Sequence, residues 1–244
     1  MTDNVEKFRA LHVPGKPLVL YNIWDAGSAK AVVAAGAPAI ATGSYGVAEA
    51  HGLADGESMP LDLVLANLSR IAATVGVPVS VDLESGYGAT LDEVTQSVIQ
   101  ARDAGASGIN MEDRLPNADE PLPVEEASRR FAAAANAGIF INARCDVFRG
   151  KTVDAALLAD AKHRATAYAD AGAAGLFVPF LSDAATIGAI CEASPIPVNI
   201  LWSDECESIA ALADLGVARI SFGHQPWAKA MADLGEAAAK LYKT

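Results

Sequence analysis

The sequence predicts a single (β/α)₈ barrel of the TIM type that spans residues 1–244, and three observations lead to this fold class. Short β-branched runs alternate with longer Ala-rich segments of helical periodicity from about Leu18 to the end of the chain, without a linker or low-complexity break. The strand candidates match the number of a closed barrel. The length of 244 residues suits one barrel domain.

The expected strands are short apolar runs bounded by turn residues. In chain order they are Leu18–Asn22, Ala37–Ala41, Pro78–Asp82, Gly108–Glu112, Phe140–Arg144, Gly175–Val178, Val198–Leu201 and Arg219–Phe222. Between them, a helix repeatedly ends in Ala-Gly or Leu-Gly before the next strand, at Gly36, Gly105, Gly172 and Gly216. Glycine suits the left-handed residue just past a helix end. The repeat therefore supports βα units and says nothing about chemistry.

A doubly wound open sheet uses the same βα units and is the competing architecture. Such a sheet that binds dinucleotides carries GxGxxG after its first strand. This chain has Asn22-Ile23-Trp24-Asp25-Ala26-Gly27-Ser28 at that place. The barrel is therefore favoured, and its functional residues are expected at the carboxyl ends of the strands.

Composition excludes several classes of protein. Hydrophobic residues make up 52% of the chain and the formal net charge is −12, so neither disorder nor binding to a nucleic-acid backbone is expected. The first residues, Met1 to Lys16, show no signal peptide, and no apolar run reaches the length of a membrane span. The sequence thus predicts a soluble, cytoplasmic protein. Cys145, Cys191 and Cys206 lack the spacing of a zinc site or a disulfide framework.

Acidic residues follow two neighbouring strands. Asp82 and Glu84 follow the third strand, and Glu112 and Asp113 follow the fourth. Residues two apart on a strand point the same way, so these carboxylates are expected to converge. Two like charges about 4 Å apart repel by roughly 4 kcal/mol at an effective dielectric near 20, which favours a bound proton or cation. Mg²⁺ prefers such oxygen ligands. Helix capping and surface ion pairing are the alternative.

Other strand ends carry groups suited to an anionic substrate. Glycines around Ser44 leave backbone N–H groups exposed, and such a nest binds carboxylate or phosphate oxygens, although an ordinary turn has the same pattern. Arg144 can clamp an anion with two hydrogen bonds. Asn199 and His224 lie near the last strands, where His224 is a candidate proton donor or a packing residue. Tyr87 either lines the pocket or takes part in the chemistry of the site.

Together these residues resemble the isocitrate lyase and phosphoenolpyruvate mutase superfamily, over most of the chain from about Leu20 to His224. The resemblance rests on several separated motifs in one order, namely Asn22–Ser28, Gly43-Ser44, Asp82-Leu83-Glu84-Ser85-Gly86-Tyr87-Gly88, Glu112-Asp113 and Asn142-Ala143-Arg144. Members of that superfamily bind Mg²⁺ and break or form a C–C or P–C bond beside a carboxylate, through an enolate of a pyruvate-like acid.

The resemblance implies a role for each matching residue. Asp82, Glu84 and Glu112 correspond to an acidic shell around Mg²⁺, with Mn²⁺ as a possible substitute. Asp55 corresponds to a catalytic acid on the loop after the second strand, and Arg144 and Glu112 are also assigned to catalysis. The substrate, a small carboxylate, would be held by Trp24, Gly43, Ser44, Tyr45, Gly46, Asn199 and His224.

Two departures from the family pattern narrow the function. Glu84 replaces an Asp and is one methylene longer, which favours ligation through water. The lyases that cleave isocitrate and methylisocitrate carry Lys-Lys-Cys-Gly-His after the fourth strand, where this chain has Arg114–Pro121. Their cysteine acid is therefore missing, and Cys145 does not simply inherit its role. Asn117 lies where phosphonate-processing members present polar residues.

The sequence thus predicts a Mg²⁺-dependent lyase or decarboxylase that cleaves a C–C bond beside the carboxylate of a small 2-oxo or 2-hydroxy acid. The alternatives are phosphonopyruvate hydrolysis or phosphoenolpyruvate mutation, and a barrel that binds a 2-oxo acid or dicarboxylate without catalysis. The resemblance also implies a homodimer or a homotetramer in which subunits exchange the final helix, Gln225–Leu241. Packing of this helix on its own barrel is the alternative.

Overall fold

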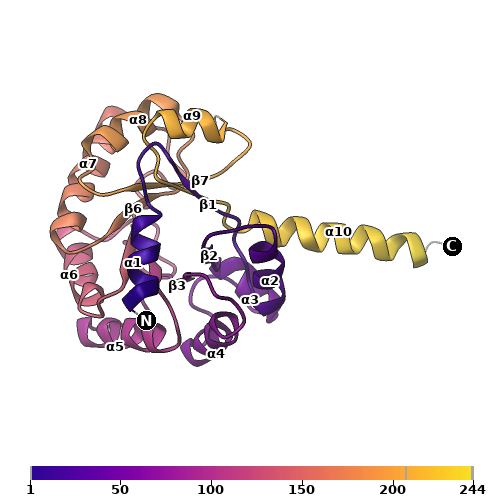
Figure 1. Cartoon of the computed structure of the whole chain (residues 1–244). Coiled ribbons are helices and arrows are strands. Elements are labelled where there is room, and N and C mark those ends of the chain that lie inside the picture. The colour runs from indigo at the N-terminus through magenta and orange to yellow at the C-terminus, as the bar shows by residue number, and fades with distance from the viewer. Residues whose placement is uncertain (1, 207, 243–244) are drawn as a thin grey trace.

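Eight parallel strands form a nearly closed barrel in the computed structural model, which describes residues 2–206 and 208–242 (Figure 1). Neighbours in the barrel follow the order β1-β8-β7-β6-β5-β4-β3-β2. Between β1 and β2 the ring is completed by a single parallel bridge, Ile23 to Thr42, just beyond both strands. The strands are β1 (Leu18–Leu20), β2 (Ile40–Ala41), β3 (Val79–Asp82), β4 (Gly108–Glu112), β5 (Phe140–Arg144), β6 (Gly175–Val178), β7 (Val198–Leu201) and β8 (Arg219–Ser221).

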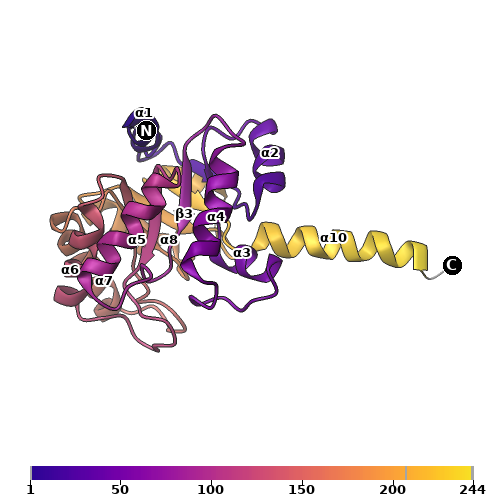
Figure 2. The same cartoon turned by 90° about the horizontal axis from the view of Figure 1, so that it is seen from below.

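Helices surround the strands and cover one end of the barrel (Figures 1 and 2). They are α1 (Thr2–Ala10), α2 (Ala26–Ala34), α3 (Ser44–Ala50), α4 (Leu61–Ala72), α5 (Leu91–Asp103), α6 (Val124–Ala135), α7 (Ala155–Asp170), α8 (Ala184–Ala193), α9 (Ile209–Asp214) and α10 (Gln225–Tyr242). On α1, Phe8 is fully buried and packs edge to face on Phe140 at the start of β5. This helix therefore closes the amino end of the barrel and leaves the carboxyl ends of the strands open.

The predicted barrel is confirmed, and β4, β5, β6 and β7 have the predicted bounds. The other strands are shorter than predicted by one to three residues. In β2 the predicted start includes Pro38, which has no N–H for a ladder hydrogen bond. After β1, Asn22 lies beyond the strand because its side chain accepts from the amides of Phe222 and Gly223 and donates to Thr42 O. The predicted range 1–244 includes residues 1, 207 and 243–244, which lie outside the described residues.

Helix ends follow the local chemistry of the sequence. The four glycines of the repeat, Gly36, Gly105, Gly172 and Gly216, all have φ between 91° and 111°, the left-handed conformation expected just past a helix end. At the start of α5, Thr90 and Glu93 form a reciprocal capping box. The βα repeat read from the sequence is therefore a true structural period.

The barrel interior is polar below the open end. Arg219 on β8 is completely buried, and it donates to Ser221 Oγ at 3.1 Å and to Asn110 Oδ1 at 3.2 Å. Asn142 on β5 donates to the same Asn110 oxygen at 2.8 Å. Burial lowers the pKa of Arg219 to about 9, although the field of Asp82 opposes this. The guanidinium of Arg219, held by amide and hydroxyl groups, thus lies below the acidic end of the barrel.

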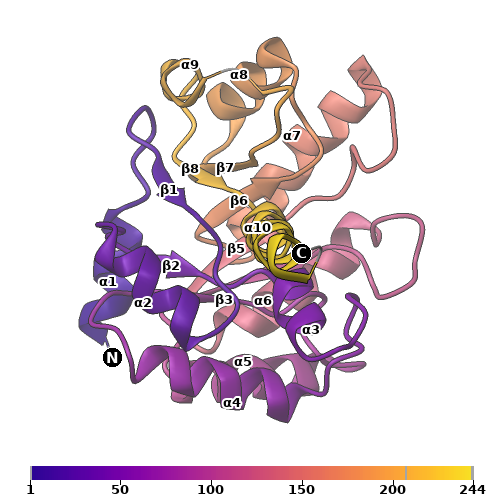
Figure 3. The same ribbon diagram turned by 90° about the vertical axis from the view of Figure 1, so that its right-hand side faces the viewer.

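The last helix leaves the barrel. Helix α10 projects outward, with its carboxyl end far from the strands (Figures 1 and 2), and Figure 3 shows it end-on. Among its described residues only Pro226 is buried, whereas Leu234 is 62% exposed. The helix bounds agree with the predicted Gln225–Leu241 except for one added residue. Among the described helices, none combines the length and the hydropathy needed to cross a bilayer.

Candidate active site

A cavity of about 410 Å³ opens at the carboxyl ends of the strands. Its walls come from β3 to β8, from the loops after every strand except β7, and from the start of α3 and the loop after it. Such a position is where (β/α)₈ barrels place their active sites. The cavity is therefore the candidate active site.

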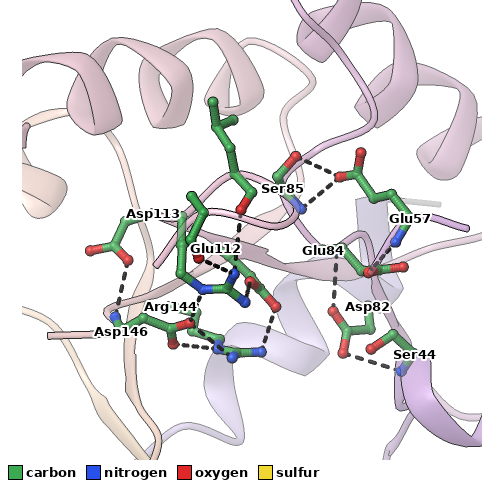
Figure 4. A network of polar contacts seen from close by, with 12 residues as sticks. Ser44, Glu57, Asp82, Glu84, Ser85, Glu112, Asp113, Arg144 and Asp146 are labelled. Atoms are coloured by element: carbon green, nitrogen blue, oxygen red, sulfur yellow. Dashed lines mark hydrogen bonds and ion pairs between the residues drawn. The ribbon is translucent and has the colours of Figure 1, made fainter. Parts of the chain in front are cut away.

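Asp82, the last residue of β3, lies at the acidic side of the cavity. Its amide is fixed by Thr42 Oγ1 at 2.9 Å, and its carboxylate accepts from Ser44 N at 3.3 Å and from Glu84 N at 3.2 Å (Figure 4). Burial raises the pKa of Asp82, Arg144 opposes the rise, and Asp55 adds to it. This carboxylate contacts no cationic side chain directly, so it is an unneutralised acid in the described part of the chain.

Glu84 lies in the loop that follows and is held by a second loop. Its carboxylate accepts from Glu57 N at 2.6 Å and from Tyr87 Oη at 3.1 Å. Burial, together with Asp82 and Asp55, raises its pKa to about 8. Glu84 has φ of 48°, a left-handed conformation that non-glycine residues adopt at a cost and often at functional sites.

Glu57 clamps the loop after α3 onto the loop after β3. Its Oε1 accepts from Ser85 N at 2.8 Å, Ser85 Oγ at 2.6 Å and Tyr87 N at 3.2 Å (Figure 4). Glu57 and Tyr87 also have left-handed φ values, 59° and 51°. We call this set of contacts the Glu57 clamp. It fixes Asp55, two residues earlier on the same loop, at the cavity wall.

Arg144, the last residue of β5, is neutralised within the protein. Its guanidinium donates to Glu112 Oε1 at 2.5 Å and to both oxygens of Asp146, at 2.7 and 3.0 Å. Arg114 binds the same two acids, at 3.2 Å from Glu112 and 3.0 Å from Asp146. Burial would lower the pKa of Arg144, but Glu112 and Asp146 outweigh it and the pKa lies above its usual value. Burial raises the pKa of Glu112 to about 7.

A buried layer behind Arg144 keeps this cluster in place. Asp113 accepts from the amide of Asp146 at 3.0 Å, from Tyr168 Oη at 2.7 Å and from Arg164 Nη1 at 3.1 Å. Burial raises the pKa of Asp113 to about 6 in spite of these donors. Asp113, a sequence candidate for the metal end of the barrel, thus positions Asp146 and does not reach the cavity lining.

The acids fit a hard divalent cation only in part. No group of three His, Cys, Asp or Glu side chains suited to a metal ion is assembled among residues 2–206 and 208–242. The reason is that Glu84 is turned to the Glu57 clamp and Glu112 is turned to two arginines. The donor set is nevertheless all oxygen, and Asp82 lacks a cationic contact. Mg²⁺ usually keeps several waters, so one or two carboxylates suffice.

Most predicted site residues line the cavity. These are Gly43, Ser44, Tyr45, Asp55, Asp82, Glu84, Glu112, Arg144 and His224. Tyr45 and His224 are in edge-to-face contact, with ring centroids 5.6 Å apart. The open end of the barrel therefore brings together residues from distant parts of the chain.

Three predicted substrate-binding residues are not among those that line the cavity. Trp24 packs against the hydrophobic core, and its carbonyl accepts from Asn67. Gly46 lies beneath Trp227, where an added Cβ would come within 3.1 Å of the Trp227 Cβ. Asn199 is buried lower in the barrel and pairs with Ser221 Oγ. Their positions favour packing roles.

The structure adds cavity residues that the sequence reasoning did not single out. Arg114, Arg149 and Phe180 line the cavity from the loops after β4, β5 and β6. Each lies in a loop without a recognisable motif. Asn22 and Asn117, which the sequence motifs do include, also line it. Cys145 is fully buried and burial raises the pKa of its thiol well above the usual value, which supports a packing role.

A nearly closed (β/α)₈ barrel with acids after β3 and β4 and an Arg at the end of β5 defines a class, the isocitrate lyase and phosphoenolpyruvate mutase superfamily. Within it, the family model described as phosphoenolpyruvate phosphomutase matches residues 8–242. The chain belongs to this family.

Two relatives cover most of this chain, and one of them has a named activity. An uncharacterized protein of Mycobacterium tuberculosis is 36% identical over 90% of this chain and 83% of its own length. The 2-methylisocitrate lyase of Escherichia coli is 31% identical over 78% of this chain and 70% of its own.

Solved structures agree with the fold. A protein of Burkholderia cenocepacia assigned as a phosphonomutase has a TM-score of 0.94 and 47% identity, covering 99% of this chain and 100% of that one. A phosphonopyruvate hydrolase in complex with oxalate and Mg²⁺ has a TM-score of 0.87 at 24% identity, covering 98% of this chain and 87% of that one. Membership of the family is therefore compatible with a lyase, a mutase or a hydrolase reaction.

Proposed function

We propose that this protein is a Mg²⁺-dependent carbon–carbon lyase or decarboxylase that acts on a small 2-oxo or 2-hydroxy acid. The observation that carries the proposal is the half-buried carboxylate of Asp82, which has no ion-pair partner among the described residues and lies beside Glu84 in the same cavity as Arg144. The 2-methylisocitrate lyase activity of the E. coli relative supports C–C chemistry, and the oxalate and Mg²⁺ of the phosphonopyruvate hydrolase support the metal.

Asp82 is the residue we assign as the metal ligand, with Glu84 and Glu112 acting directly or through water. Mg²⁺, or Mn²⁺, held by these acids would supply positive charge to offset the negative charge that develops on the substrate. Arg144 provides donors for the substrate carboxylate, and Ser44, whose amide already donates to Asp82, lines the same cavity. Glu112 orients the guanidinium of Arg144 through their 2.5 Å ion pair.

Asp55 is the proposed general base or acid. With a 2-hydroxy acid, its carboxylate takes the hydroxyl proton, the oxygen electrons form a carbonyl, and the adjacent C–C bond breaks. The bonding pair then remains on the departing carboxylic acid as an enolate, which takes up a proton. With a 2-oxo diacid, loss of CO₂ leaves the enolate directly. His224, opposite Tyr45 in the cavity lining, is a candidate donor of that proton.

P–C bond chemistry is the second candidate. The match to the phosphoenolpyruvate phosphomutase family and the 47% identical phosphonomutase-type structure favour it. In this chain Asn117 lines the cavity from the loop after β4, with a left-handed φ of 60°. The same enolate would then follow cleavage of a P–C bond, with the phosphoryl group passing to water in a hydrolase or to the enolate oxygen in a mutase.

The test is release of pyruvate or glyoxylate from a substrate panel, with and without Mg²⁺. The panel contains oxaloacetate, phosphonopyruvate, alkylmalates and alkylcitrates, and the variant Asp82→Ala is the control. Metal-dependent turnover of a C–C substrate that is lost in the variant supports the lyase, whereas turnover of phosphonopyruvate alone moves the function to P–C chemistry. If compounds bind with Mg²⁺ and none reacts, the protein is a binding barrel.

We also propose that copies of the chain associate through α10, as a dimer or a tetramer. The helix projects from the barrel (Figure 1). It exposes Met231 (36%) and Leu234 (62%), which an isolated barrel would leave in water. Light scattering of the purified chain and of a Leu234→Glu variant tests this. A monomer in both would refute it.

A further inference from the structure

The two sides of the cavity differ in chemistry. All acids in its lining, Asp55, Asp82, Glu84 and Glu112, come from β3, the loop after β3, β4 and the loop after α3. The opposite side comes from β6, β7 and the loops after β5 and β6. It carries arginine and apolar side chains and no acid among its described lining residues. A substrate held at Asp82 therefore extends towards a side without negative charge.

Arg149 is the cationic group of that side that lacks a protein partner. The other cavity arginines, Arg114 and Arg144, are each paired with both Glu112 and Asp146. Arg149 is exposed, and no carboxylate of the described residues lies within ion-pair distance of its side chain. Its guanidinium is therefore free to bind an anion from the cavity.

The backbone under Arg149 is fixed, so the side chain is presented from a defined place. Its amide donates to Asp146 O at 3.0 Å, and Asp146 is itself held by Arg144 and Asp113. Just after it, Lys151 is paired at 2.6 Å with Glu120, in the loop after β4. The turn at residues 146–151 thus connects the paired arginines, Arg114 and Arg144, to the rim of the cavity.

Phe180 separates Arg144 from this rim. The residue has φ of 61°, which is strained for a bulky side chain, and it is 47% exposed although it is aromatic. Its ring lies 5.6 Å from the Arg144 Cζ. With Phe177, Pro179 and Leu201 it forms an apolar strip on the same side of the cavity. The strip therefore offers apolar contacts beside Arg144.

We propose that Arg149 and the apolar strip form a second substrate subsite, which binds a distal carboxylate carried on a short apolar segment. This inference rests on the proposed function, because the first carboxylate is assumed to lie near Asp82 and Arg144. The substrate class is then a 2-oxo or 2-hydroxy dicarboxylic acid with hydrocarbon between its two ends. A planar guanidinium matches a carboxylate with two parallel hydrogen bonds.

The experiment measures binding of two non-reacting 2-oxo acids by calorimetry in the presence of Mg²⁺. 2-Oxoglutarate carries a distal carboxylate, and 2-oxopentanoate has a methyl group in its place. The wild-type protein is expected to bind 2-oxoglutarate roughly tenfold more tightly, the value of one partly exposed charge-assisted hydrogen bond. Arg149→Gln is expected to remove this preference without weakening 2-oxopentanoate. Arg129→Gln, an exposed arginine of α6 outside the lining, is the control.

Several outcomes would overturn the subsite. These are equal affinity of the two acids in the wild-type protein, equal weakening of both acids by Arg149→Gln, and loss of the preference in Arg129→Gln. Phe180→Ala, which shortens the strip, is expected to weaken both acids. Because these measurements need no turnover, failure of the proposed reaction leaves them informative. Turnover confined to monocarboxylates would refute the subsite while the lyase reaction stands.

Discussion

Loss of the Glu57 clamp is expected to free the loop that carries Asp55. In Glu57→Ala the acceptor for Ser85 N, Ser85 Oγ and Tyr87 N disappears. A hydrogen bond to a charged group contributes about 1.5 to 3 kcal/mol. Because the loop is partly exposed, we count only one such bond, about 2 kcal/mol, which shifts an opening equilibrium by roughly 30-fold.

Hydrogen exchange followed by mass spectrometry measures this opening without any substrate. Amides in residues 51–60 and 83–88 are expected to exchange roughly 30-fold faster in Glu57→Ala, since the amide of Glu57 also donates to Glu84. Glu57→Gln keeps one acceptor oxygen and is expected to stay within about threefold of the wild type. Turnover, once a substrate is known, should follow the same order through the position of Asp55.

The matched control is Glu49→Ala, an exposed acid on the preceding helix α3. It removes the same charge from the neighbourhood and leaves the clamp intact. Unchanged exchange in Glu57→Ala, or equal acceleration in Glu49→Ala, would refute the clamp. Equal loss in Glu57→Ala and Glu57→Gln would show that charge, and not the acceptor geometry, holds the loop.

Three further predictions concern stability. Burial, together with the field of Arg219, lowers the pKa of His12 from 6.5 to about 3, so the unfolded chain binds more protons between these values. The contribution of buried, neutral His12 to the free energy of unfolding is complete above pH 6.5. It is lost as the pH falls, so that the free energy of unfolding is about 2 kcal/mol lower near pH 5. Thermal melts of His12→Gln should therefore lose part of the wild-type pH dependence, and those of exposed His163→Gln should not. Gly88→Ala would place a Cβ 2.5 Å from Val94 N, whereas a Cβ on Gly76 meets nothing within 4 Å. Melting should show a loss of about 2 kcal/mol or more for Gly88→Ala and almost none for Gly76→Ala, and equal melts would contradict the close contact. Tyr168→Phe removes the hydroxyl that donates to Asp113 at 2.7 Å, and chemical denaturation should show a loss of about 2 kcal/mol. A loss within about 0.5 kcal/mol would mean that this buried network is not coupled to folding.

The βα repeat and the acids at the strand ends could be predicted from the sequence alone. Strand composition and the glycines past each helix are local properties, so β4 to β7 and Gly36, Gly105, Gly172 and Gly216 were predicted correctly. The closure of parallel strands into a barrel places all carboxyl ends together. That geometry brings Asp82, Glu112 and Arg144 into one cavity, as their strand positions indicated.

Long-range packing sets which partner each charged side chain takes. Glu84 is a predicted metal ligand, and the structure adds that one of its carboxylate oxygens accepts from the amide of Glu57, which lies 27 residues earlier in the chain. Arg149 and Phe180 lie in loops whose side-chain directions no sequence period fixes, so their place in the cavity was not foreseen. Burial also depends on segments that are distant in the sequence. Desolvation by the whole barrel raises the pKa of Asp82 and lowers that of Arg219. Local sequence therefore specifies the elements and their ends, whereas charge pairing and desolvation depend on long-range packing.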